Sequence, residues 1–332
     1  MSKHLFKIPE KGGQTKIQQL VHAVSSAISN GQLREGEILP SINKLSSESG
    51  FSRDTVFKAY SILQKRSLIE SAPTRGYYVT GGAFRIVMLL DDFSAFKENL
   101  YKSFRSNLPE SYSVDLLFHH YNHEVFNQLI QNSLGRYSVY IVMNIDHRGM
   151  EPVLEKIEPG KLLILDMGMP SSANISYIVQ DFNHAVERCL EDGKNLLCKY
   201  SELILVYNEI DTPHPSETTL AVKRFCKKHG IRYTKVDKAG DTEVKKGQCW
   251  FTIRDSDLVE VVKKSHEKGL VTGKDIGIVS FNDTPMKQIA EGGISVISTD
   301  FEQMGILAAG FVKNRQKITQ ILPTSLILRK SI

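Results

Sequence analysis

Gly50-Phe51-Ser52-Arg53-Asp54-Thr55-Val56-Phe57-Lys58-Ala59-Tyr60 is the stretch that decides how this chain is organised. Gly50 suits the left-handed turn that ends a short helix, because a residue without Cβ adopts that conformation at no steric cost. Ser52 is a good N-cap for the next helix, since its hydroxyl can accept from free backbone N–H groups. The helix that Ser52 caps presents Arg53 and Thr55 in its first turn. A helix with this tip, following a short helix and a glycine turn, is typical of proteins that enter a DNA groove.

The flanking residues extend this pattern into a small domain. Upstream, the segment 31–41 separates two amphipathic helices, the first of them predicted over Gln14–Ser29, and Ser41 can cap the second. Downstream, Leu68–Glu70 and Gly76–Val79 are predicted as two short strands on either side of a turn. The sequence therefore predicts a helix-turn-helix followed by a β-wing.

Three blocks of this region resemble the GntR family of winged-helix bacterial transcription regulators. They are Gly-x-Leu-x-x-Gly-x-x-Leu-Pro-Ser ending at Ser41, Ser-Arg-x-Thr-Val-x-x-Ala starting at Ser52, and Arg-Gly-Tyr ending at Tyr77. The resemblance covers residues 14–80 and implies double-stranded operator DNA as a partner. The residues that it places at the DNA are Ser41, Asn43, Ser52, Arg53, Asp54, Thr55, Lys58, Arg75 and Gly76.

Several of these residues have a chemistry that suits DNA. Arg53 can donate two hydrogen bonds to guanine O6 and N7, worth about 1–3 kcal/mol of discrimination. Ser41 and Thr55 are short hydroxyl donors suited to phosphates. Arg75 and Gly76 at the wing tip fit a minor-groove approach. Lys58 either reaches a base or a phosphate, or is a solvated surface residue.

The distribution of charge along the sequence also favours DNA binding by the first part of the chain. Residues 1–82 contain 11 Lys and Arg against 6 Asp and Glu, and the remaining residues balance at 31 of each sign, so the net charge of +5 lies in the first quarter of the chain. Positive charge attracts DNA phosphates.

There is no apolar run long enough to span a bilayer and no signal peptide, so no membrane partner and a cytoplasmic location are expected. The four cysteines, without a CxxC pattern, are interpreted as free thiols.

From Phe84 onward, apolar strands alternate with helical stretches. About ten strands are predicted, the first of them over Arg85–Leu90. Such a pattern indicates parallel sheets covered on both faces, and ten strands favour two sheets side by side. The predicted fold class is α/β, with an N-terminal winged helix-turn-helix at 1–80, a linker at 81–84 and a two-lobed body at 85–332.

This second part resembles the sugar-sensing domain of LacI-type repressors, which shares its fold with periplasmic sugar-binding proteins. The block that carries the resemblance runs from Gly269 to Asp283, and the strand and helix around Ile294–Gly305 fit the same family. A GntR-type head on a LacI-type body is the arrangement of the bacterial arabinose repressors.

An effector cleft is expected between the lobes, at the carboxyl ends of the parallel strands. Sugar recognition needs oxygens that accept from hydroxyl groups and an aromatic face for the ring. Asp255 and Thr299 fall where the LacI-type resemblance places ligand contacts, although Asp92 or Asp255 could instead be helix N-caps. The candidate effector residues are Asp91, Asp92, Phe93, Phe96, His147, Arg148, Asp181, Phe182, Glu217, Asp255 and Thr299.

The sequence contains no other recognisable chemistry. His119-His120-x-x-His123 has the spacing of metal ligands but no companion group, and is interpreted as surface histidines. No phosphate-binding loop, nucleophile elbow or metalloprotease motif is present, so no catalytic residue, metal or cofactor is predicted.

The predicted function is a transcription regulator, a repressor in the expected case, that acts as a homodimer on a palindromic operator. A pentose or deoxyhexose, such as arabinose or fucose, is the expected effector. Two alternatives remain open: the same architecture sensing a nucleobase or an amine, and a DNA-binding head fused to an enzyme.

Overall fold

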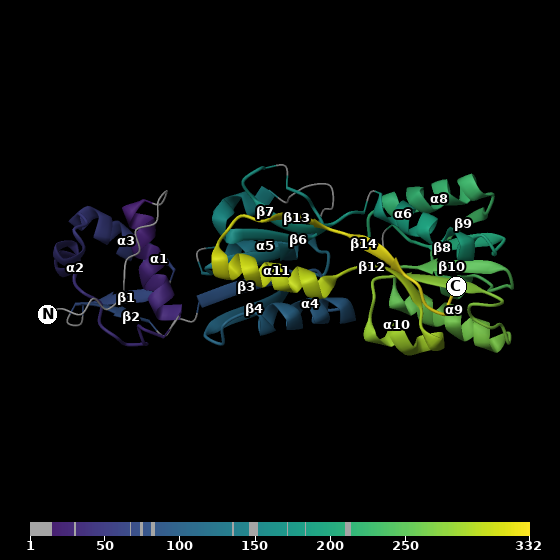
Figure 1. Cartoon of the computed structure of the whole chain (residues 1–332), viewed down its shortest axis with the longest axis horizontal. Coiled ribbons are helices and arrows are strands. Elements are labelled where there is room, and N and C mark those ends of the chain that lie inside the picture. Colours follow the sequence, from purple (N-terminus) through teal and green to yellow (C-terminus); the bar gives the residue numbers. More distant parts are fainter. Residues whose placement is uncertain are drawn as a thin grey trace.

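The computed structural model describes residues 15–29, 31–66, 68–73, 76–80, 84–134, 136–145, 152–170, 172–182, 184–209 and 214–332. Three bodies follow one another along the long axis of the molecule (Figure 1). They are called here the head, with described residues between 15 and 80, the near lobe, whose first strand along the chain is β3 (Phe84–Leu90), and the far lobe, whose first strand along the chain is β8 (Glu202–Val206). The predicted linker residues 81–83 lie outside the described residues, and the division into domains at 80 and 85 stays a prediction.

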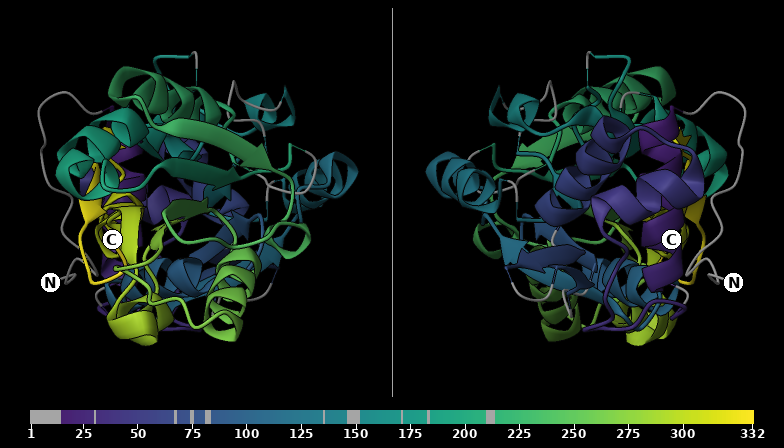
Figure 2. Two further views of the ribbon diagram at one scale, coloured as in Figure 1. Left: turned by 90° about the vertical axis from the view of Figure 1, so that its right-hand side faces the viewer. Right: turned by 90° about the vertical axis from the view of Figure 1, so that its left-hand side faces the viewer.

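The head contains α1 (Lys16–Ser29), α2 (Ile42–Ser49), α3 (Arg53–Lys65) and an antiparallel wing of β1 (Ile69–Ala72) and β2 (Gly76–Val79). The predicted turn is confirmed: Gly50 has φ 72°, and the Ser52 hydroxyl accepts from the backbone N–H of Thr55 at 3.1 Å. Apolar side chains of the three helices and the wing form one core, in which Tyr60 is fully buried and donates to the Pro40 carbonyl at 2.8 Å. Figure 2 (right) shows these helices from the head end, in front of the lobes.

The near lobe is built on a parallel sheet of six strands in the order β13-β7-β6-β5-β3-β4. Its strands are β3 (Phe84–Leu90), β4 (Tyr112–Phe118), β5 (Val139–Met143), β6 (Leu162–Asp166), β7 (Ser176–Gln180) and β13 (Thr319–Leu322). Its helices are α4 (Ala95–Ser106), α5 (His123–Ser133), α11 (Phe301–Asn314) and the 3₁₀ turns η1 (Pro152–Lys156) and η2 (Pro159–Lys161). Helices α4 and α11 pack closely, since a Cβ at Gly305 would collide with the backbone of Leu100 and Phe104.

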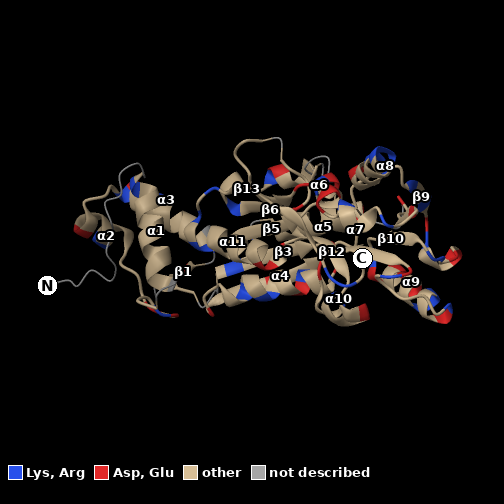
Figure 3. Cartoon of the chain, turned by 45° about the vertical axis from the view of Figure 1, so that its right-hand side comes forward, with Lys and Arg blue, Asp and Glu red and all other residues tan. Residues whose placement is uncertain are grey.

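The far lobe has a second six-stranded sheet in the order β14-β12-β11-β10-β8-β9. Its strands are β8 (Glu202–Val206), β9 (Arg232–Val236), β10 (Gln248–Thr252), β11 (Gly277–Phe281), β12 (Ser295–Thr299) and β14 (Thr324–Ile327). Its helices are α6 (Ala185–Asp192), α7 (Lys194–Leu197), α8 (Glu217–His229), α9 (Asp255–Glu267) and α10 (Pro285–Ile289), with 3₁₀ turns η3 (Ala239–Asp241) and η4 (Ala290–Gly292). Figure 3 shows acidic and basic residues interspersed over α9, whereas α8 is mainly basic.

Two strands were not predicted from the sequence. β13 and β14 follow α11 and complete one sheet each, and β14 runs antiparallel to β12. Both are short, and their exposed, partly polar faces lack the continuous apolar run of the other strands. The expectation of two parallel sheets is therefore confirmed for all strands except β14.

The chain crosses between the lobes three times, after β7, after β12 and between β13 and β14. A buried network joins these crossings: the Thr299 hydroxyl lies 2.8 Å from both the Gln180 Oε1 atom and the Thr324 hydroxyl. One residue of each crossing thus contributes to the same set of hydrogen bonds. These residues, Gln180, Thr299 and Thr324, are called the hinge network here, because the chain crosses between the lobes at this place.

Candidate DNA-binding surface and effector cleft

The predicted DNA-binding side chains that the structure describes lie on the outside of the head. Arg53, Asp54 and Lys58 are exposed at the start of α3, and Asn43 is exposed in the first turn of α2. Lys58 Nζ lies 2.7 Å from Asp54 Oδ2, one helical turn away. Arg75 falls outside the described residues, and Gly76 is exposed at the first position of β2. α3 therefore presents a polar, charged strip to solvent.

The predicted hydroxyl donors have a structural role in the free protein. Ser41 caps α2 by accepting from the backbone N–H of Lys44 at 3.2 Å, and Ser52 caps α3. The hydroxyls of Ser52 and Thr55 lie 2.8 Å apart. These bonds fix the first turns of both helices, which determines where Arg53 points.

On the near-lobe side of the cleft, a buried lysine joins two of the predicted effector residues. Lys97 Nζ forms ion pairs with Asp91 and, at 2.5 Å, with Asp92, and the Tyr121 hydroxyl donates to Asp91 at 2.6 Å. Burial alone would lower the pKa of Lys97, but the two carboxylates outweigh it and raise that pKa. Asp91 and Lys97 are each 2% exposed, whereas Asp92 is half-exposed and accessible to a ligand. Asp92 is not a helix N-cap, because α4 begins after Ser94.

A second acidic group lies at the end of β6. Asp166 is buried in a left-handed conformation with φ 69°, and its Oδ1 atom accepts from the side-chain amide of Gln180. Burial raises the pKa of Asp166 to about 6. Because Gln180 also accepts from Thr299, this carboxyl group is hydrogen-bonded into the hinge network.

The interpretation of the three histidines as surface residues was wrong for His119. Its side chain is fully buried, with Nε2 3.1 Å from the Met143 carbonyl and Nδ1 accepting from the Tyr121 N–H. Burial lowers its pKa to about 4, so the ring is neutral near pH 7. The described part of the chain contains no cluster of three potential metal ligands.

The predicted aromatic residues differ in exposure. Phe93 is 53% exposed and contacts Phe118 edge-on, with ring centroids 5.9 Å apart. Phe96 is half-buried against Phe301 at 4.5 Å. Phe93 therefore offers a free apolar face near Asp92, and Phe96 mainly supports the start of α11.

A cavity of about 520 Å³ lies between the lobes beside the first crossing. Three of the predicted residues line it, namely Asp181, Phe182 and Glu217, together with Gln180 of the hinge network and apolar side chains that include Met167 and Ile321. Phe182 stacks on Phe281 of the far lobe. Asp181 accepts from Arg188 at 3.0 Å.

On the far-lobe side, Asp255 is the first residue of α9 and forms an ion pair with buried Lys287 at 2.8 Å. Lys287 also donates to the carbonyl oxygens of Phe281 and Asn282 at the end of β11. Burial lowers the pKa of Lys287, and the Asp255 carboxylate only partly offsets that effect. Asp255 remains 61% exposed at its side chain, so it can still accept from a ligand. Asp255 is not the N-cap of α9, a position that Arg254 occupies.

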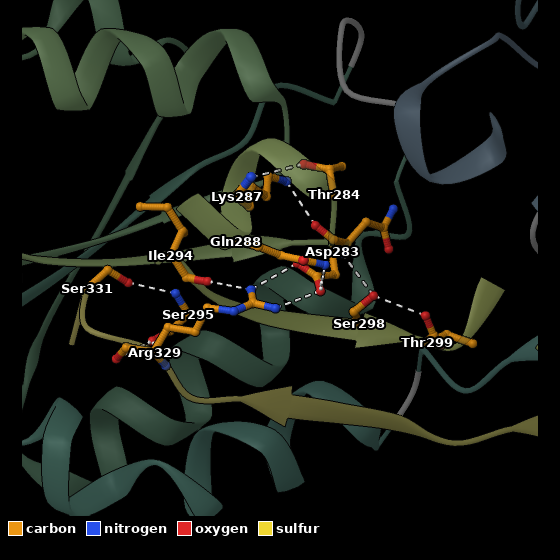
Figure 4. A network of polar contacts seen from close by, with 11 residues as sticks. Asp283, Thr284, Lys287, Gln288, Ile294, Ser295, Ser298, Thr299, Arg329 and Ser331 are labelled. Carbon is orange, nitrogen blue, oxygen red and sulfur yellow. Dashed lines mark hydrogen bonds and ion pairs between the residues drawn. The ribbon is translucent and has the colours of Figure 1, made fainter. Parts of the chain in front are cut away.

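Figure 4 shows the polar network around Lys287 and the end of β11. Arg329 donates to both carboxylate oxygens of Asp283, at 2.9 and 2.7 Å, and to the Ile294 carbonyl. Ser298 at the end of β12 accepts from the Asp283 N–H. The carboxyl ends of β11 and β12 are thereby held in one arrangement on the far-lobe side of the cleft.

The predicted effector residues thus fall into separate groups, with Asp91 and Asp92 at Lys97, Asp181 and Glu217 at the cavity, and Asp255 at Lys287. His147 and Arg148 lie outside the described residues. Sequence reasoning missed the buried polar residues Lys97, Asp166, Gln180 and Lys287 and the half-buried Tyr121. Asp166 and Gln180 could have been found as polar residues that end buried strands, whereas a lysine in a helix normally indicates a solvated surface.

Comparisons with known proteins agree with these two parts. Residues 16–79 match the family described as bacterial regulatory proteins, gntR family, and residues 199–332 match the periplasmic binding protein-like domain. The chain joins a GntR-type DNA-binding domain to a periplasmic-binding-protein-like domain. The GntR-type head is 42% identical over 65 residues to the uncharacterized HTH-type transcriptional regulator YjiR of Escherichia coli strain K12. That match covers 20% of this chain and 14% of YjiR.

The periplasmic-binding-protein-like body matches solved structures of transcription regulators. The trehalose repressor from Escherichia coli superposes with a TM-score of 0.61 and 13% identity, covering 74% of this chain and 100% of that chain. The lac repressor dimer bound to operator and the anti-inducer ONPF gives a TM-score of 0.59 and 16% identity, covering 75% and 94%. These likenesses establish the two-lobed fold. The matched families and structures are those of regulators and binding proteins, not of enzymes. Among the residues described, no helix is long and apolar enough to cross a membrane.

Proposed function

We propose that this protein is a transcription repressor that binds a palindromic operator as a homodimer and responds to a small sugar held between its lobes. The observation that carries the proposal is the joining of an exposed, capped recognition helix to a hinged body whose polar side chains collect at the ends of its strands. Because the DNA target would be chromosomal, the proposed site of action is the cytoplasm.

The DNA-binding part rests on the geometry of α3. Ser52 fixes the first turn, Val56 and Tyr60 hold the helix against the head core, and Arg53 projects into solvent. An arginine in that position can read guanine in the major groove. The lac repressor, which shares the fold of the body, is a dimer on its operator, and a two-fold dimer matches a two-fold site.

The effector part rests on the cleft chemistry. Asp92 and Asp255 are accessible carboxylates on opposite lobes, and Phe93 exposes an aromatic face beside the first. This combination suits a polyhydroxylated ring, and a trehalose repressor shares the fold. A pentose or deoxyhexose is the proposed class, and the ligand would shift operator affinity by a coupling of about 1–3 kcal/mol.

The accessible carboxylates also favour a second candidate, an amine effector. A cationic group could pair with Asp255 or with Asp92, each of which is at least 45% exposed. A thermal-shift panel of monosaccharides, amines and nucleobases separates the two candidates. Stabilisation by amines and by no monosaccharide would replace the sugar proposal.

Two substitutions test the proposal, each with a matched control. Arg53→Ala should lower discrimination between selected operators and unrelated duplexes by about 1–3 kcal/mol, whereas Arg232→Ala, at an exposed arginine of the far lobe, should leave it unchanged. Asp255→Ala should remove the ligand response and retain operator binding. A protein that keeps sequence discrimination without Arg53 would contradict the DNA-binding role, and a normal ligand response without Asp255 would remove that residue from the site.

A further inference from the structure

A large apolar side chain is exposed on the recognition helix. Phe57 lies in the second turn of α3 and is 54% exposed, although Val56, Ala59, Tyr60 and Leu63 of the same helix are fully buried in the head core. Single exposed apolar side chains are common on protein surfaces, so the argument for a partner depends on where this ring lies on the helix.

Helical geometry places this ring among the residues that face DNA. Successive residues advance by about 100°, so Phe57 lies about 40° from Arg53 and about 60° from Asp54 around the helix axis. The buried residue Ala59 lies about 160° away on the other side. Phe57 thus lies between Arg53 and Asp54 on the exposed strip of α3, and fully buried Tyr60, about 60° from Phe57, marks the edge of that strip.

The spacing of Arg53 and Phe57 along the axis of α3 determines which base pairs the Phe57 ring can reach. Arg53 and Phe57 are one turn apart, about 6 Å, and stacked base pairs are separated by about 3.4 Å. A helix that docks Arg53 on a guanine therefore brings Phe57 to the major-groove edge one or two base pairs away. A phenyl ring has no hydrogen-bond donor or acceptor, and the apolar group that this edge offers is the thymine C5-methyl.

We propose that Phe57 is a specificity-determining residue that packs on a thymine methyl group one or two base pairs from the guanine bound by Arg53. The inference rests on the proposed operator binding and adds to it the identity of a second base. It also explains why the strip between the charged residues contains a ring that the head core leaves uncovered.

The first experiment identifies the base. Full-length protein selects binding sites from a randomised duplex library, in parallel for wild type, Phe57→Ala, Phe57→Leu and Leu220→Ala. Leu220, 55% exposed on α8 of the far lobe, is the matched control for loss of an exposed apolar side chain. The wild type and Leu220→Ala should select the same motif, with a thymine at a fixed offset from a guanine. Phe57→Ala should retain the guanine and lose the thymine preference, and Phe57→Leu should retain both.

The second experiment removes only the methyl group. Deoxyuridine replaces that thymine in the selected duplex, and the expected result is roughly fourfold weaker binding by wild type, the effect of leaving one methyl group unburied. Phe57→Ala should bind the two duplexes equally. Equal binding of both duplexes by wild type, or an unchanged motif for Phe57→Ala, overturns the inference.

The outcomes also separate this inference from the function on which it rests. If wild type selects no motif, the operator-binding proposal fails and the role of Phe57 fails with it. If wild type selects an Arg53-dependent motif that is insensitive to deoxyuridine, only the role of Phe57 fails. Dissociation of the dimer by Phe57→Ala in sedimentation, with the motif unchanged, would assign the ring to a protein contact instead.

Discussion

Replacing Asp166 by asparagine should make the protein more stable, and only above about pH 4. Asp166 is buried at the end of β6, where its carboxyl group accepts from the Gln180 amide. Asparagine has nearly the same shape and keeps a carbonyl oxygen at the accepting position, so the hydrogen bond to Gln180 survives the change. What the substitution removes is the negative charge in a position without access to water.

The size of the effect follows from the pKa of that carboxyl group. Burial raises the pKa of Asp166 from about 3.8 to about 6 in the folded protein, a change of about two pH units. Between these values the folded state binds more protons than the unfolded state, so the free energy of unfolding falls as pH rises. Each unit of pKa difference corresponds to 1.36 kcal/mol, so the charged carboxylate lowers the free energy of unfolding by about 3 kcal/mol above pH 6 and has no effect below pH 4.

The assay is urea unfolding, followed by circular dichroism, of wild type and Asp166→Asn at intervals from pH 4 to pH 8. The free energy of unfolding of the variant should exceed that of wild type by a margin that grows from near zero at pH 4 to about 3 kcal/mol at pH 7. Asp192→Asn, at an exposed aspartate that ends α6, is the control and should follow wild type throughout. A margin that is constant with pH, or that shrinks as pH rises, would refute the argument that burial of this charge destabilises the fold.

Three further substitutions test other parts of the structure. Lys97→Ala should lower the free energy of unfolding by about 3–5 kcal/mol, because it leaves buried Asp91 unpaired, whereas Lys102→Ala on the exposed side of α4 should change it by less than about 1 kcal/mol. Tyr60→Phe should lower the free energy of unfolding of the head by about 1 kcal/mol, because it removes the hydrogen bond to the Pro40 carbonyl. Thermal unfolding measures this change, and an unchanged stability would show that the bond does not stabilise the head. Thr299→Val should lower the free energy of unfolding by about 1–3 kcal/mol, because it leaves Gln180 without its hydroxyl donor. It should also broaden the range of lobe separations measured by X-ray scattering, and an unaltered scattering profile would argue against a role of the hinge network in holding the lobes.

The sequence predicted the fold because its signals are local. A glycine that ends a helix, a serine that caps the next and an apolar run of strand length each act within a few residues, so Gly50, Ser52 and β3 are found where the pattern places them. β13 and β14 escaped prediction because the pairing that makes them strands involves β7 and β12, more than 20 residues earlier in the chain. The burial of His119 was missed for the same reason, since its partner is the carbonyl of Met143 on β5, and β3 lies between β5 and β4 in the sheet.

The sequence by itself determined the order of a DNA-binding head and a two-lobed body, and the residues that α3 presents, because caps, turns and periodicity depend on near neighbours. Only the tertiary structure decided which polar residues from different elements contact one another. Gln180 at the end of β7 contacts Asp166 of β6 and Thr299 of β12, and Lys287 of α10 contacts Asp255 of α9. A buried charge is tolerated only where the fold supplies its partner, and for Lys287 that partner, Asp255, lies on another helix.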